Sequence, residues 1–185
     1  KPNTLQMQYL QKHEVDFKLP LEDFFRYQSN ETEVDSYNSN AYEEYDTSMT
    51  VDGLRSKSEQ LFELYCERQE DIDWIYKNGD SGQQYLSIVY GTNISKEYLF
   101  YPDYIIKKKN GELWIIETKG GEIQGKSKNI DKQIANKFIA FKEYAENHKI
   151  KWGFVRDKNQ RLYINNTVYT EEMQTEHWVK LESLF

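Results

Sequence analysis

Two apolar segments joined by a short turn decide the fold: FYPDYII at residues 100–106 and LWIIETKG at residues 113–120. An Asn-Gly pair lies between them, and apolar runs that flank Asn-Gly predict a β-hairpin. Strands this apolar on both faces are normally central and buried. Three charged residues interrupt them, Asp103, Glu117 and Lys119. These charges need compensation for the loss of water, so we expect them to lie together.

The length of the loop decides whether the three charges can meet. A two-residue turn would place Asp103 opposite Thr118, so that the carboxylates of Asp103 and Glu117 lie on different faces of the hairpin. A three-residue loop at residues 109–111, ending in a glycine with left-handed backbone conformation, would place the two carboxylates opposite each other. The lysine would then share their face. We predict the three-residue loop, because this register brings all three groups together.

Two carboxylates near a backbone carbonyl suit a hard divalent cation such as Mg²⁺, which prefers oxygen ligands. We expect Asp103, Glu117 and the carbonyl oxygen of Thr118 to be the ligands, and Mn²⁺ to substitute for Mg²⁺. The ion would polarise a phosphodiester and generate hydroxide from bound water. Lys119 would orient that water or stabilise the negative charge of the transition state. The glycines at residues 120–121 would allow a DNA backbone to approach closely.

A helix is expected ahead of the hairpin, from the Ser-Lys-Ser-Glu sequence at residues 56–59 to about Asp71. Its acid Glu59 is a further candidate metal ligand. A capping box explains Ser56 and Glu59 without any catalysis, so both interpretations of this acid stay open.

The charges of the hairpin are similar to a known pattern. Pro102-Asp103, a spacing of fourteen residues and then Glu117-Thr118-Lys119 resemble the PD-(D/E)XK nuclease superfamily at its three defining charges. The neighbouring sequences YPDYII and WIIETKG, with Ser-Lys-Ser-Glu ahead, resemble the C-terminal endonuclease domain of type III restriction enzyme Res subunits over about residues 54–155. The resemblance implies a restriction-endonuclease-like core with the order α-β-β-β-α-β and Mg²⁺-dependent cleavage of double-stranded DNA.

The same resemblance implies partners: a helicase-like domain upstream in the full-length chain, and a modification (methyltransferase) subunit. Residues 1–185 contain no Gly-x-x-x-x-Gly-Lys-Ser/Thr phosphate loop, so we expect no ATP site in them. Two other functions stay open, namely another PD-(D/E)XK nuclease of DNA repair or junctions, and a catalytically idle module that binds DNA or a partner. The intact charges argue against idleness, because an unneeded buried charge is costly.

The remaining patterns predict an α/β (α+β) fold in which helices flank a mixed, mostly antiparallel sheet. Strands are predicted at residues 74–76, 85–90, 98–106, 112–118, 152–155 and 162–164, and further helices at residues 131–147 and 171–184. Residues 1–52 are expected to be an extension, with a β-hairpin over about residues 5–19 and a polar arm over residues 28–52. Residues 53–185 would form the endonuclease domain.

The distribution of charge is compatible with binding to DNA even though the formal net charge is −7. Residues 1–50 hold ten acidic and four basic residues, whereas residues 101–151 hold eleven lysines and seven acidic residues. Side chains after the hairpin are the candidates for contacts with DNA phosphates: Lys126, Lys128, Lys132, Gln133 and Lys137. A solvated helix face is the alternative interpretation of the lysines, and a plain helix residue is the alternative interpretation of Gln133.

The composition of the chain narrows the classes of protein to which it could belong. The single cysteine, Cys66, excludes an internal disulfide framework and is expected to pack inside a helix. The three histidines have no metal-ligand spacing, so we interpret them as structural or surface residues. No apolar run approaches the length of a membrane span, and no signal-peptide pattern is present at the start of the sequence. We therefore expect a cytoplasmic protein.

Overall fold

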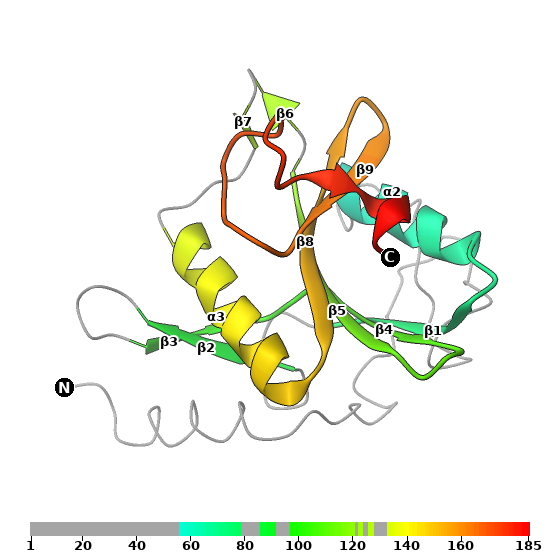
Figure 1. Cartoon of the computed structure of the whole chain (residues 1–185), viewed down its shortest axis with the longest axis horizontal. Helices are drawn as coiled ribbons and strands as arrows, with labels where there is room; N and C mark the ends of the chain where they lie inside the picture. Colours follow the sequence, from blue (N-terminus) through cyan, green and yellow to red (C-terminus); the bar gives the residue numbers. More distant parts are fainter. Residues whose placement is uncertain (1–55, 79–85, 92–96, 121, 124–125, 128–132) are drawn as a thin grey trace, which may run out of the picture.

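The computed structural model describes residues 56–78, 86–91, 97–120, 122–123, 126–127 and 133–185. The predicted N-terminal hairpin and polar arm lie outside these residues. In the described part, a six-stranded mixed sheet lies between two helices, and Figure 1 shows these helices on opposite faces of the sheet. The prediction of a mixed sheet flanked by helices is confirmed.

The hairpin at the centre of the sheet consists of β4 (Tyr104–Lys108) and β5 (Leu113–Lys119). Tyr104 pairs with Ile116, the register of a three-residue loop. The amide of Lys108 donates to the Glu112 carbonyl at 2.9 Å, and the backbone of Gly111 has φ +91°. A positive φ of this kind favours glycine. The predicted loop and register are confirmed.

The strand order is β1-β4-β5-β8-β9-β10, with β1 at Ile72–Lys77, β8 at Lys151–Lys158, β9 at Arg161–Asn165 and β10 at Val179–Lys180. Neighbouring strands are antiparallel except for β5 and β8. Helix α3 (Ile134–His148) connects these two, because parallel neighbours require a long crossover. Setting aside the small two-stranded sheets, the main elements follow the order α2 (Lys57–Glu67), β1, β4, β5, α3 and β8, and strands β9 and β10 come after β8.

The predicted strand at residues 98–106 is wrong as a single element. The chain forms β3 (Glu97–Phe100) and then β4, separated by residues 101–103. β3 pairs with β2 (Ile88–Gly91) in a separate two-stranded sheet. Pro102 lies in this break, where its missing N–H removes a ladder hydrogen bond. A second small sheet pairs β6 (Glu122–Ile123) with β7 (Lys126–Ser127).

Each face of the sheet carries its own hydrophobic core. On one face, Ile105 and Ile115 pack with Phe138 and Phe141 of α3. On the other face, residues of β1, β4, β5 and β8 pack against α2 (Lys57–Glu67). The buried thiol of Cys66 lies in this second core, as predicted. The sheet is therefore buried on both sides. Charged side chains of its strands lie where the strands leave these cores, and there they need polar partners.

Both long helices were predicted, with different ends. α2 begins with the predicted capping box, in which Ser56 and Glu59 bind each other's backbone amides at 3.2 and 2.7 Å. It ends at Glu67, four residues earlier than expected, because Ile72 already belongs to β1. α3 begins at Ile134 and ends before Lys149, which has φ +55°.

The predicted C-terminal helix at residues 171–184 is wrong. The segment contains β10 (Val179–Lys180) and the short 3₁₀ helix η2 (Leu181–Ser183). Tertiary contacts override the helical pattern: Val179 pairs with Ile164 of β9, and the ring of Trp178 covers the buried guanidinium of Arg156 at 4.3 Å. In the part of the chain that the structure describes, no helix has the length and apolar character needed to cross a membrane.

Candidate metal and nuclease site

Glu117 and Lys119 form a close ion pair at the end of β5. Oε1 of Glu117 lies 2.6 Å from Nζ of Lys119, and Glu117 is 6% exposed. Its second oxygen, Oε2, is buried and has no hydrogen-bond partner among the described residues. Burial and the nearby negative charge of Asp103 raise the pKa of Glu117 to about 8, although Lys119 opposes the shift. Glu117 is thus a carboxyl group with an unused acceptor.

Asp103 lies immediately before β4 and binds the neighbouring strand. Its Oδ2 accepts hydrogen bonds from the amide and the hydroxyl of Thr118, at 2.8 and 2.7 Å. Its Oδ1 accepts from Nζ of Lys77 at 3.0 Å. Burial raises the pKa of Asp103, but Lys77 and the Thr118 hydrogen bonds outweigh it and hold the pKa below its ordinary value. Asp103 is therefore an ionised carboxylate at this site.

Lys77 connects Asp103 to Glu59. The Nζ atom of Lys77 lies 3.0 Å from Oε1 of Glu59 and 3.0 Å from Oδ1 of Asp103. It also lies 4.8 Å from the centre of the Tyr104 ring. Sequence reasoning missed Lys77. The available signal was its place as a charged residue at the end of an apolar strand, the position that Lys119 also has.

A buried asparagine holds the backbone at Pro102 and Asp103. The side-chain amide of Asn78 donates to the carbonyls of Pro102 and Leu86, both at 2.8 Å, and accepts from the Leu86 amide at 3.1 Å. Its own backbone amide donates to the Asp103 carbonyl at 2.7 Å. Asn78 is a positioning residue for Asp103 that its tertiary partners alone reveal.

The start of α2 is attached to the end of β5. The hydroxyl of Ser58 lies 2.5 Å from the carbonyl oxygen of Lys119 and also contacts the carboxylate of Asp157. Ser58 is 1% exposed. This contact brings the first turn of α2, with Glu59, to the strand end that carries Glu117 and Lys119. We call Glu59, Lys77, Asp103, Glu117 and Lys119 the charge cluster.

The carboxylate oxygens of the charge cluster have unused lone pairs that could bind a divalent cation. A carboxylate offers about four lone-pair sites. Asp103 uses three of them and Glu117 uses one. The N–H and C=O of a strand residue point to the same side, so the Thr118 carbonyl points to the side of Asp103, as its amide does. Among the described residues, however, no group of three or more His, Cys, Asp or Glu side chains is arranged to hold a metal ion.

The predicted DNA contacts lie partly outside the described residues. Lys128 and Lys132 are not described, and Lys126 is described in its backbone within β7. Gln133 precedes α3 and accepts a hydrogen bond from Asn136 at 2.9 Å. Nζ of Lys137 lies 5.6 Å from the centre of the Tyr90 ring.

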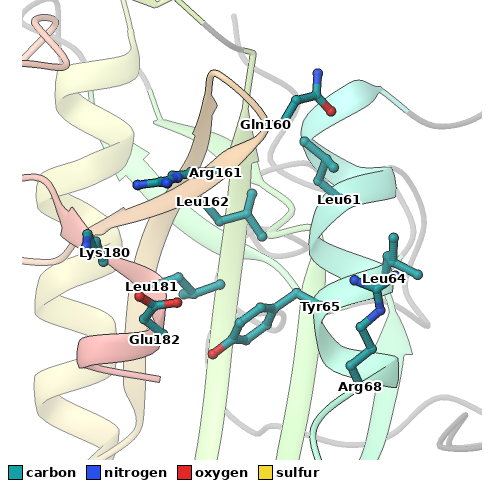
Figure 2. A pocket seen from close by; sticks show the side chains of 10 residues that line it. All are labelled: Leu61, Leu64, Tyr65, Arg68, Gln160, Arg161, Leu162, Lys180, Leu181 and Glu182. Carbon is teal, nitrogen blue, oxygen red and sulfur yellow. The ribbon is translucent and has the colours of Figure 1, made fainter.

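A separate groove of about 480 Å³ lies between α2, β9 and η2. Figure 2 shows Tyr65 reaching from α2 towards Leu181 and Glu182. Leucines form much of the lining, and Arg68, Arg161 and Lys180 contribute basic groups. The residues of the charge cluster do not line this groove.

Comparison with known proteins finds no relative that indicates a function, so a functional assignment depends on the residues of the site. No family model matches the sequence, and no match was found among curated proteins or solved structures.

Proposed function

We propose that this chain carries a Mg²⁺-dependent endodeoxyribonuclease domain that hydrolyses phosphodiester bonds of double-stranded DNA. The observation that carries the proposal is the register of the β4–β5 hairpin, in which Tyr104 pairs with Ile116. Continued by one residue, this register brings Asp103 level with Glu117, beside the Glu117–Lys119 ion pair of 2.6 Å. Two carboxylates and an ammonium at the ends of buried strands suit metal-assisted phosphodiester hydrolysis.

The order of elements also supports the proposal. The core order α2, β1, β4, β5, α3, β8 agrees with the α-β-β-β-α-β order that the resemblance to PD-(D/E)XK nucleases implies. The sequence similarity to Res subunits of type III restriction enzymes extends the proposal to a helicase-like domain and a methyltransferase subunit as partners. Fold alone does not imply function, so the proposal depends mainly on the residues of the site.

Each residue has a proposed role. Asp103, Glu117 and the Thr118 carbonyl would hold the cation, which when bound supplies Lewis-acid polarisation of the phosphodiester and lowers the pKa of water. The Lys119 ammonium would stabilise the negative charge that develops on the phosphoryl oxygens. Asn78 and Thr118 position Asp103 through hydrogen bonds of 2.7 and 2.8 Å. Glu59 would anchor Lys77 and not bind the cation, because both of its oxygens already have partners. One oxygen accepts a hydrogen bond from the Ser56 amide, and the other forms the ion pair with Lys77.

The first test combines titration of Mn²⁺ by calorimetry with nicking of supercoiled plasmid, for the wild type and for Asp103→Ala. We expect loss of both metal binding and nicking in the variant. Asp73→Ala is the matched control, because Asp73 is an exposed acid on β1, four residues before Lys77. Equal and negligible Mn²⁺ binding by all proteins would contradict the nuclease and favour the idle DNA- or partner-binding module. Metal-dependent cleavage confined to junction DNA would favour the repair nuclease.

A further inference from the structure

Lys77 is a nearly buried ammonium group placed between two carboxylates. Its side chain is 14% exposed, and its Nζ lies at the same distance, 3.0 Å, from Glu59 and Asp103. It is the last residue of β1 and pairs with Tyr104, the first residue of β4. The three groups come from α2, β1 and the segment before β4, so no local sequence feature requires them to meet.

The oxygen that Lys77 occupies is the one that a cation needs. Thr118 donates two hydrogen bonds to Oδ2 of Asp103, which leaves Oδ1 as the oxygen with an unused lone pair. An ammonium 3.0 Å from that oxygen repels a divalent cation on the same oxygen. At a buried site this repulsion is weakly screened.

The charge balance of the cluster also indicates that a divalent cation alone binds poorly. With all groups ionised, the three carboxylates of Glu59, Asp103 and Glu117 exceed the two ammonium groups by one negative charge. A divalent cation alone would leave an excess positive charge. A divalent cation together with one phosphodiester would bring the cluster to neutrality.

We propose that Lys77 is a positioning residue that acts as a built-in cation: it holds Asp103 and Glu59 in place without metal, and it weakens the binding of metal in the absence of a phosphodiester. This inference rests on the proposed function, because it concerns the same metal site. It predicts that cations and DNA bind to the site cooperatively, and that removal of the Lys77 charge raises the affinity for the cation in the absence of DNA.

The test is titration of Mn²⁺ alone into the full chain by calorimetry, for the wild type, Lys77→Met and Lys77→Arg. We expect Lys77→Met to bind Mn²⁺ about tenfold more tightly than the wild type and to melt at a lower temperature without metal. Lys77→Arg should resemble the wild type. Lys151→Met is the matched control, because Lys151 forms an exposed ion pair with Glu112 at 2.6 Å, on the same sheet.

A double variant keeps the test decisive if Lys77→Met does not fold. Glu59→Gln with Lys77→Met removes one negative and one positive charge together, and should also bind Mn²⁺ more tightly than the wild type. Mn²⁺ affinity equal to that of the wild type in every folded Lys77→Met variant would overturn the role of Lys77 while leaving the metal site intact. Absence of Mn²⁺ binding from the wild type and all variants would instead overturn the proposed function, and the inference with it.

Discussion

Glu117 and Lys119 lie two residues apart on β5, and their side chains meet at 2.6 Å where the strand leaves the hydrophobic core. A strand presents residues i and i+2 on the same face, so this spacing places the carboxylate and the ammonium side by side. The pair is buried, and Oε2 of Glu117 remains without a partner among the described residues. A carboxyl in this position is sensitive to both protons and cations.

The first prediction concerns pH. The pKa of Glu117 is raised from 4.5 to about 8, so the folded protein binds this proton more tightly than the unfolded chain does. The stabilisation that this bound proton gives to the folded state is full below about pH 4.5 and is lost as the pH rises towards 8. We expect the metal-free wild type to lose on the order of a few kcal/mol of unfolding free energy over this range, relative to Glu117→Gln. Urea unfolding of both proteins between pH 5 and 8 measures the difference, and parallel profiles would contradict it.

The second prediction separates metal binding from catalysis. Lys119→Met removes the ammonium beside Glu117 but leaves the carboxylates of Asp103 and Glu117 in place. We expect Mn²⁺ binding to persist and plasmid nicking to fall by roughly 10²–10³-fold, the usual effect of removing one group that stabilises transition-state charge. Single-turnover nicking at saturating Mn²⁺ is the measurement. Full nicking activity in Lys119→Met would show that the lysine has no catalytic role.

The third prediction decides the role of Glu59. Its Oε2 accepts from the Ser56 amide at 2.7 Å and its Oε1 contacts Lys77 at 3.0 Å, so we propose an anchor rather than a metal ligand. Glu59→Gln keeps the capping box, which glutamine also forms. We expect this variant to retain Mn²⁺ binding in calorimetry, whereas Asp103→Ala loses it. Loss of binding in Glu59→Gln as complete as in Asp103→Ala would instead make Glu59 a ligand.

The fourth prediction concerns Asn78. Its side chain makes three buried hydrogen bonds, including one to the Pro102 carbonyl, and the residue is 4% exposed. Asn78→Ala would leave buried backbone groups without partners, and we expect a loss of about 3 kcal/mol of unfolding free energy. Asn110→Ala removes an exposed side-chain hydrogen bond to the Glu112 amide and is the control. Urea unfolding compares the two variants, and equal small losses would show that Asn78 does not hold the segment before β4.

Local patterns in the sequence predicted the central hairpin and the start of α2 correctly. The glycine at position 111 adopts φ +91°, and the Ser56–Glu59 capping box forms as expected. Both features depend on residues within a few positions of each other. The register that brings Asp103 level with Glu117 follows from the loop length, and the sequence indicated that length only through the expectation that the three charges meet.

Features that depend on distant segments could not be predicted in this way. The sequence alone determined the hairpin and the two main helices, and it named every residue of the charge cluster except Lys77, because periodicity and turn chemistry act over short distances. Only the tertiary structure placed Lys77 between Glu59 and Asp103, bound Asn78 to Pro102 and turned the C-terminal segment into β10 and η2. In each case a buried polar or aromatic group finds its partner on another element, and the free energy of that pairing outweighs local propensity.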